Sequence, residues 1–354
     1  MTSERLASVD ALRGLTVAAM LLVNDAGDWG HVYAPLEHAQ WNGSTPADLV
    51  FPFFLFLVGV SISLGMGARI GAGTDTAALR RAVWVRALRI VLLGLVLHAV
   101  AHVAMDTRAF RPFGVLQRIG LCYAAAGLIA VHARPRTQWL VLAAILVGDW
   151  LLMSWGGPLT KEANLASRID TALLGGHAYE LDAATGRAHD PEGLLTTLPA
   201  IATTLLGLRA GEWLRGGRAA RLVPAALVCL ALGAAWSLVF PLNKNLWTSS
   251  FVLWTGGWAL LALAAAHAAI DRRRWPAIGR SLGVNAIAVY AGSWLMVCAL
   301  EGLHWGRPLY RVGFAWMTPV TGPYLPSLAW ALAFVACWWG IAVVMERRGM
   351  RIRI

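Results

Sequence analysis

The stretch at residues 38–59, HAQWNGSTPADLVFPFFLFLVG, decides the architecture of this chain. Its second half is almost wholly apolar, as is typical of a helix that crosses a membrane. Its first half concentrates side chains that form hydrogen bonds, namely His38, Trp41, Asn42, Ser44, Thr45 and Asp48. Because polar groups at the edge of hydrocarbon are costly unless they are paired or used, we interpret this segment as the rim of an active site at the mouth of a membrane helix.

The composition of the whole chain is that of a polytopic membrane protein. Of its 354 residues, 58% are hydrophobic and 14% are charged, and 18 are tryptophan. We predict an all-α fold, an integral membrane bundle of about 10 helices that forms a single domain over residues 1–354. The predicted spans are 11–27, 47–66, 83–103, 115–132, 137–153, 194–210, 220–240, 247–268, 283–300 and 326–345.

The basic residues follow the expected membrane topology. A net charge of +11 could indicate a nucleic-acid partner, but the basic residues alternate from loop to loop. If the N-terminus is cytoplasmic, 21 of the 30 Lys and Arg residues lie on the cytoplasmic side and 9 on the outer side. This bias predicts that both termini are cytoplasmic, that the loop at 67–82 is internal and that the long loop at 154–193 is external. We therefore expect a lipid bilayer as partner and no nucleic acid.

The first predicted span carries a polar face. Asp10, Arg13 and Asn24 recur with Val17 and Met20 at steps of three and four residues, which places them on one side of a helix. This face would extend over about 21 Å, most of the membrane thickness, and suggests the wall of a cavity. The alternative is an interfacial ion pair between Asp10 and Arg13, with Asn24 capping the helix end. The span lacks a convincing cleavage site, so we expect it to be retained rather than removed as a signal peptide.

Two cations occupy positions that the topology disfavours. Gln117 and Arg118 begin the fourth span on the expected outer side, and Lys244 lies in a short outer turn between Asn243 and Asn245. We expect Arg118 to pair with a carboxylate or to orient amide groups near His38, although a purely structural pairing is an equal alternative. The segment DPEG at 190–193, at the end of the external loop, is typical of a capped helix start.

The cysteines indicate neither a disulfide framework nor a metal site. Each of the four lies within a predicted span, where a thiol behaves as a small apolar group, and none has the spacing of a metal ligand. We therefore expect no metal. The residues concerned are Cys122, Cys229, Cys298 and Cys337.

Six motifs, in order, are similar to those of a known family. They are SVDALRG at 8–14, HAQWNGSTPADLVFPFFLF at 38–56, GVLQRIGLCY at 114–123, DPEGLLTTLPAI at 190–201, FPLNKNLW at 240–247 and GVNAIAVY at 283–290. Through them the chain resembles, nearly end to end, the transmembrane acetyltransferase family of the lysosomal heparan-α-glucosaminide N-acetyltransferase and its bacterial relatives. The resemblance implies a helical bundle in a bacterial inner membrane that takes acetyl-CoA from the cytoplasm and acetylates the amine of an amino sugar on the opposite, periplasmic face.

The resemblance also implies roles for two residues. His38 resembles the family's catalytic histidine, and Asn24 resembles its neighbouring site asparagine. The large lumenal domain that precedes the membrane region in the lysosomal enzyme has no counterpart in this sequence, and the loop between Asn24 and His38 is longer. We therefore expect a smaller amino sugar, such as glucosamine or a terminal glucosaminide.

A mechanism follows from these assignments. His38 could act as a general base toward the attacking amine or as a nucleophile that carries the acetyl group, and the sequence leaves both routes open. Asp48 completes the predicted catalytic group, and Asn24, Trp41 or Asn42 could donate hydrogen bonds to the developing oxyanion. The predicted substrate-binding residues are Trp41, Asn42, Gln117, Arg118, Asn243, Lys244 and Asn245. The predicted acetyl-CoA contacts, near the cytoplasmic helix ends, are Arg13, Arg280 and Asn285.

Other functions remain open at this point. The polar face of the first span could line the permeation path of a sugar or amino-sugar transporter. An acyltransferase that modifies a hydroxyl would have the same membrane architecture. The sequence shows no convincing internal repeat of the kind found in many transporters. The oligomeric state is unreadable, and a homodimer is possible.

Overall fold

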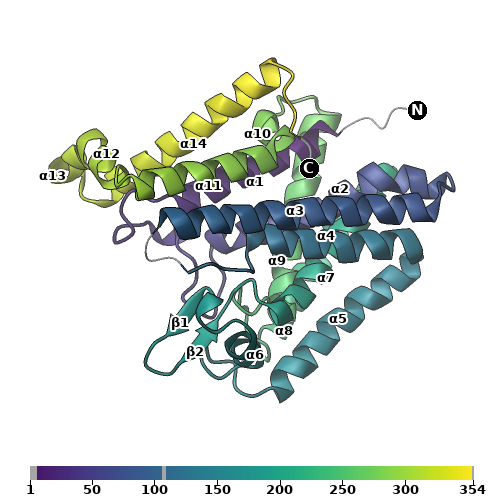
Figure 1. The fold of residues 1–354 in the computed structure, drawn as a ribbon. Helices are drawn as coiled ribbons and strands as arrows, with labels where there is room; N and C mark the ends of the chain where they lie inside the picture. Colours follow the sequence, from purple (N-terminus) through teal and green to yellow (C-terminus); the bar gives the residue numbers. More distant parts are fainter. Residues whose placement is uncertain (1–5, 106–108, 353–354) are drawn as a thin grey trace.

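The computed structural model describes residues 6–105 and 109–352, and it shows an all-α membrane bundle (Figure 1). Nine helical segments in these residues are long and apolar enough to cross a membrane. Their helices are α1 Ala7–Asn24, α2 Val50–Gly71, α3 Thr76–Ala104, α4 Val115–His132, α5 Pro135–Trp155, α7 Leu194–Arg215, α8 Leu222–Trp236, α9 Ser249–Ala266 and α14 Tyr324–Arg347.

A tenth predicted span corresponds to a bent pair of helices. Helix α11, Ala286–Gly302, follows the short α10, Arg280–Val284, and is bent by 92° from α12, Gly306–Gly313. The four-residue α13, Thr318–Thr321, then leads into α14. The prediction of about ten helices in an all-α bundle is confirmed.

The bundle has two ends with different structures. One end, which we call the hairpin face, carries α6 Leu165–Leu173 and the antiparallel strands β1 Glu180–Asp182 and β2 Arg187–His189 (Figure 1). Helices α12 and α13 lie at this end as well. The other end, the terminal face, carries both ends of the described chain and the short turn between α2 and α3. Because α1 begins at the terminal face, the loop that follows it at 25–49 lies at the hairpin face.

Helices α2 and α7 form the centre of the bundle because glycines allow their backbones to meet. A Cβ atom added to Gly59 would overlap the carbonyl of Thr204, and one added to Gly207 would overlap the carbonyl of Phe56. Small residues at such crossings let membrane helices approach closely and gain packing contacts. Both helices are therefore rigid supports for the loops at their ends.

The predicted boundaries needed two corrections. The first helix begins four residues earlier than the predicted span 11–27 and ends three residues earlier, at Asn24. The predicted extent of the loop at 67–82 is wrong. Helix α2 continues to Gly71 and α3 already begins at Thr76, so the loop is much shorter. Glycine is tolerated within membrane helices, and Asp75 caps α3 by accepting a hydrogen bond from the Ala77 amide at 2.9 Å.

Candidate active site

His38 lies at the hairpin face with its imidazole directed at a buried carboxylate. Its Nδ1 atom is 2.9 Å from Oδ1 of Asp48, whose side chain is fully buried, whereas the imidazole is 43% exposed. Oδ1 of Asp48 has no hydrogen-bond partner among the described residues, so this contact is a close approach of the two groups. A carboxylate behind one ring nitrogen leaves the other nitrogen to face a reactant.

The loop around Asp48 is organised by the carboxylate itself. Oδ2 of Asp48 accepts hydrogen bonds from the backbone amides of Ala39 at 3.1 Å and Thr45 at 3.0 Å. With Thr45 it forms a capping box at the start of the 3-10 turn Pro46–Leu49, which leads directly into α2. The sequence T-P-A-D therefore fixes both the helix start and the position of the carboxylate next to His38.

Lys244 comes from a distant part of the chain and completes the cluster. Its Nζ atom lies 3.0 Å from Nε2 of His38 and 3.7 Å from Oδ1 of Asp48. We call these three side chains the His38 cluster. Since an ammonium can only donate, Nε2 is the acceptor in this contact and the ring proton of a neutral His38 lies on Nδ1, toward Asp48.

Two loops hold Lys244 beside His38. The amide of Asn243 donates to Oδ1 of Asn42 at 3.1 Å, and the backbone amide of Gly43 donates to the carbonyl of Leu242 at 2.8 Å. Asn243 also accepts from the backbone amide of Leu246 within its own turn. These contacts join the loop at 38–48 to the turn between α8 and α9, and Asn245 is partly buried in the same turn.

Trp247 anchors that turn in the core. It adopts a positive φ of 53°, which is unfavourable for a bulky side chain, and its ring is almost completely buried. Its indole N–H donates to Oγ1 of Thr203 on α7 at 3.0 Å, and the guanidinium of Arg118 lies 5.1 Å from its ring centroid. The strained backbone is thus held by contacts to two spanning helices.

Trp41 connects the His38 loop to the long loop at 154–193. Its indole N–H donates to the carbonyl of Leu159 at 2.8 Å, and its ring packs edge-on against His189 at 5.3 Å between centroids. In this structure the indole donor is therefore engaged with the loop backbone.

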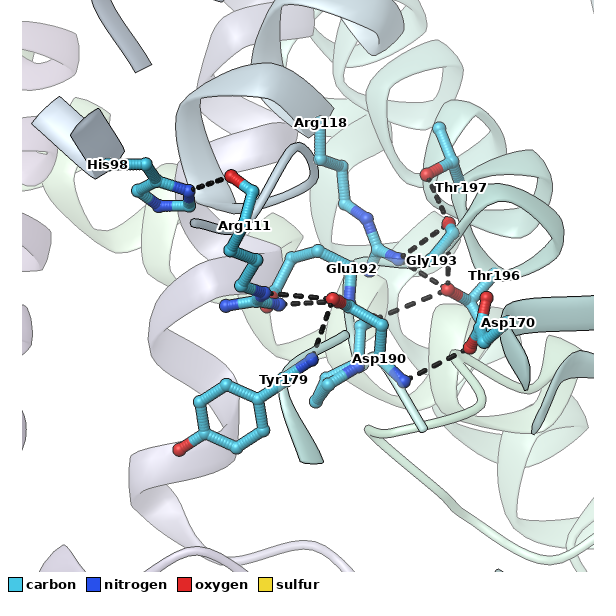
Figure 2. A network of polar contacts seen from close by, with 11 residues as sticks. His98, Arg111, Arg118, Asp170, Tyr179, Asp190, Glu192, Gly193, Thr196 and Thr197 are labelled. Carbon is cyan, nitrogen blue, oxygen red and sulfur yellow. Dashed lines mark hydrogen bonds and ion pairs between the residues drawn. The ribbon is translucent and has the colours of Figure 1, made fainter. Parts of the chain in front are cut away.

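A second polar cluster lies next to the first and is shown in Figure 2. Arg111 binds two carboxylates: Nε donates to Asp190 at 2.8 Å, and Nη2 donates to both Asp190 and Glu192. Asp190 also accepts from the backbone amides of Tyr179 and Glu192, and its own amide donates to Asp170 at 3.0 Å. We call Arg111, Asp170, Asp190 and Glu192 the Arg111 network.

The charges of the two clusters influence one another. Burial alone would raise the pKa of Glu192, but Arg111 and Arg118 outweigh it and lower that pKa, with a smaller contribution from Lys244. Burial lowers the pKa of Lys244, although the carboxylates of Asp48 and Glu192 oppose this effect. Burial raises the pKa of Asp170 to about 7. Lys244 therefore interacts electrostatically with carboxylates of both clusters, Asp48 and Glu192.

Gln117 and Arg118 point to different neighbours. Arg118 is fully buried and donates through Nη2 to Thr196 and to the carbonyl of Gly193, whereas its Nε and Nη1 have no hydrogen-bond partner among the described residues (Figure 2). Gln117 faces a crevice between α3, α4 and α11, next to His98, and both atoms of its amide lack a partner in the described part of the chain. Arg118 belongs to the neighbourhood of Lys244, and Gln117 does not contact His38.

The expected acetyl-CoA residues gather where α1 packs against α10. Arg13 donates to Asp10 at 3.0 Å, to the Gly283 carbonyl at 3.2 Å and to Ser61 at 2.8 Å. The ion pair between Asp10 and Arg13 is thus present, and the polar face of α1 mostly meets neighbouring helices. Arg280 is half-exposed and lies 3.7 Å from Glu346.

Asn285 and Asn24 occupy contrasting positions. Asn285 sits at the break between α10 and α11, is fully buried, and neither atom of its amide has a partner in the residues that the structure describes. Asn24 is the exposed last residue of α1 at the hairpin face, outside the contacts of the His38 cluster.

Within residues 6–105 and 109–352, no group of three His, Cys, Asp or Glu side chains is arranged to hold a metal ion.

Comparison with known proteins identifies the family. The family model described as heparan-alpha-glucosaminide N-acetyltransferase, catalytic, matches residues 5–242. The chain belongs to this family. It is 30% identical to human heparan-alpha-glucosaminide N-acetyltransferase over 81% of its length and 29% identical to the mouse enzyme over 82%. The alignments cover 52% and 53% of these relatives, so the chain spans about half of their length.

Sequence reasoning missed one central residue of the site region. Arg111 was not selected, although it lies on the same expected outer side as Arg118 and Lys244 and close before the fourth span. The rule that drew attention to those two cations, a basic residue on the disfavoured side, would have found it. DPEG does precede a helix, but Asp190 and Glu192 bind Arg111, and the α7 N-terminus has no side-chain cap.

Proposed function

We propose that this chain is a membrane acetyltransferase that transfers the acetyl group of acetyl-CoA to the amine of an amino sugar bound at the hairpin face. The observation that carries the proposal is the His38 cluster, where a half-exposed imidazole lies 2.9 Å from a fully buried carboxylate. Membership in the N-acetyltransferase family supports the same chemistry.

In this mechanism His38 acts on the proton of the attacking amine. Asp48 holds the imidazole so that Nε2 faces the acceptor, and its negative charge stabilises the imidazolium formed when Nε2 takes the proton. The amine attacks the thioester carbonyl, the carbon–sulfur bond breaks, and coenzyme A leaves as a thiol. Asn24 and Asn42, both exposed at the hairpin face, are the proposed donors to the oxyanion.

Acetyl-CoA reaches this site from the terminal face in our proposal. Arg280 is exposed there and suits a phosphate group, and the buried amide of Asn285 suits an amide of the pantetheine arm. The bias of basic residues toward the terminal face supports a cytoplasmic location for it, with the hairpin face in the periplasm. The substrate that we propose is glucosamine or a terminal glucosaminide.

The test is acetyl transfer by the purified protein in lipid nanodiscs. Acetyl-CoA and glucosamine should together yield N-acetylglucosamine and an equal amount of free coenzyme A thiol, and neither should form when one substrate is omitted. Sugar flux into liposomes without acetyl-CoA would instead identify a transporter. Acetylation of N-acetylglucosamine at rates equal to those with glucosamine would identify a hydroxyl acceptor.

The orientation has its own test. A single cysteine introduced in the loop at 154–193 should react with a membrane-impermeant maleimide in intact cells, whereas a cysteine at the turn 72–75 should react only after the cells are broken. The opposite pattern would reverse the proposed direction of transfer.

A further inference from the structure

The chain places one of its own amines against the candidate base. Nζ of Lys244 lies 3.0 Å from Nε2 of His38, the atom that takes the proton in the proposed mechanism. The acceptor sugar presents the same functional group, a primary amine on an sp³ carbon. Lys244 therefore occupies the position in which an acceptor amine would be deprotonated.

We propose, building on the proposed function, that Lys244 is a modification site: without an amino sugar, the enzyme acetylates Nζ of its own Lys244. Coenzyme A thiol is the second product. The same base and the same acetyl donor serve both reactions, so the sugar amine and Lys244 compete for one acetyl group.

The step uses groups already present in the His38 cluster. The Lys244 ammonium gives one proton to Nε2 of His38, and the resulting lone pair on Nζ attacks the thioester carbonyl carbon. The carbon–sulfur bond then breaks, and the sulfur leaves with its electron pair and takes the second proton that Nζ loses. An amide and a thiol replace an amine and a thioester, and no other reactant is required.

The surroundings of Lys244 allow this reaction. Its side chain is 18% exposed and its Nζ lies 3.0 Å from Nε2 of His38, so we expect an acyl donor bound beside His38 to reach Nζ as well. Burial and the nearby charge of Arg118 both favour the neutral amine and lower the pKa of Lys244, against the opposing effect of Asp48 and Glu192. Acetylation would remove the positive charge beside Asp48 and place an amide against Nε2, so the modified enzyme should no longer acetylate the sugar.

The chain contains a matched internal control. Its only other lysine is Lys161, which lies at the same face, pairs with Glu180 and is 44% exposed. Lys161 is more accessible than Lys244 and is outside the His38 cluster. Uncatalysed acetylation by acetyl-CoA should therefore favour Lys161, whereas acetylation by the site should favour Lys244.

The experiment incubates the full chain in nanodiscs with isotopically labelled acetyl-CoA and measures both lysine peptides by mass spectrometry. Without sugar, Lys244 should be acetylated about 100-fold faster than Lys161, within the range of general-base catalysis. Saturating glucosamine should slow the reaction at Lys244 and leave Lys161 unchanged. His38→Ala should reduce acetylation at Lys244 to the rate seen at Lys161, and Lys244→Arg should remain unmodified because a guanidinium is a poor nucleophile.

The outcomes separate this inference from the proposed function. If glucosamine is acetylated but Lys244 is modified no faster than Lys161, self-acetylation is excluded and the proposed function stands. If acetylation of Lys244 is fast but insensitive to glucosamine, the lysine does not occupy the acceptor position, and this result is independent of whether the His38 variant folds. If neither glucosamine nor Lys244 is acetylated, both proposals fail.

Discussion

The His38 cluster and the Arg111 network are neighbours at the hairpin face, but they differ in how their charges are paired. Arg111 is buried and binds two buried carboxylates, of which Asp190 also accepts hydrogen bonds from two backbone amides. In the His38 cluster the carboxylate is buried, whereas the imidazole is half-exposed and contacts Lys244, whose side chain is 18% exposed. A saturated network of buried charges is suited to fix the positions of the surrounding loops, whereas the incompletely enclosed His38 cluster is where we propose that a substrate exchanges contacts.

The largest expected effect is the loss of turnover in His38→Ala. Removing a general base typically lowers a rate by about 10²–10⁴-fold, and the folded protein should persist because the ring is partly exposed. Acetyl transfer to glucosamine and the thermal unfolding midpoint should be measured on the same preparation. His38→Asn is the partner variant, since it keeps a hydrogen bond but cannot take a proton at neutral pH.

His31→Ala is a matched control for that experiment. His31 also lies 2.8 Å from an aspartate, Asp28, in the same loop, but that aspartate is exposed rather than buried. This variant should keep turnover within about twofold of the wild type, because surface pairs of this kind contribute little. Equal losses in both variants would remove the distinction between the two histidines.

The second effect concerns stability rather than rate. Arg111→Ala leaves Asp190 and Glu192 buried without their cation, which should cost about 3–5 kcal/mol of folding stability. The expected readout is a large drop in the unfolding midpoint and poor recovery of folded protein from detergent. Arg187→Ala, which removes an exposed guanidinium from the loop that carries Asp190 and Glu192, should change stability by less than about 1 kcal/mol. A stable Arg111→Ala protein would contradict the structural role of the network.

A third prediction concerns the effect of pH on stability, which should differ between the buried His189 and the exposed His177. Burial lowers the pKa of His189 to about 4, against opposing contributions from Glu180 and Asp190. The unfolded chain binds this proton below pH 6.5 while the folded chain does so only near pH 4, so stability decreases as the pH falls through this window. From pH 7 to pH 5 the wild type should therefore lose about 2 kcal/mol more than His189→Gln.

His177→Gln is the control for the pH experiment. His177 lies in the same loop and is exposed, with its Nδ1 atom 2.8 Å from the Phe110 carbonyl. Comparing the two variants separates the effect of the buried imidazole from the general effect of removing a histidine from this loop. If His189→Gln and the wild type respond equally to pH, His189 does not stay neutral in the folded protein.

The helices of this fold could be predicted because hydropathy and length act locally. Each predicted span corresponds to a helix, and the errors lie at the ends, as with α2 and α3, where helix-forming residues continue past the hydrocarbon. The capping box at Thr45 and Asp48 was not predicted, although it is also a local feature with its residues three positions apart.

The assembly of the site was harder to predict because its contacts are distant in the sequence. Lys244 and His38 are 206 residues apart, and they meet because the turn between α8 and α9 contacts the loop at 38–48. The sequence marked both residues as unusual without showing that they touch. For Arg13 the contact with Asp10 is local and was a predicted alternative, but the contacts with Ser61 and the Gly283 carbonyl come from distant segments. The guanidinium of Arg280 is half-exposed instead.

The smallest predicted effect concerns Arg13 and Arg280 at the terminal face. As in the two clusters at the hairpin face, one cation is engaged within the protein and the other is partly exposed. Arg280→Ala should weaken acetyl-CoA binding about tenfold, because one exposed charge-assisted contact to a phosphate is lost, and should leave stability unchanged. Arg13→Ala should instead lower the unfolding midpoint, because buried Asp10 loses its cation, with little change in the affinity of the protein that remains folded. Titration calorimetry with acetyl-CoA provides both affinities, and Arg134→Ala, an exposed arginine in the turn between α4 and α5, controls for the change in net charge. The opposite result would be a stable Arg13 variant that binds acetyl-CoA tenfold more weakly and an Arg280 variant that binds it normally. In that case, the hydrogen bonds that an arginine forms within the protein would not show whether it stabilises the fold or binds acetyl-CoA.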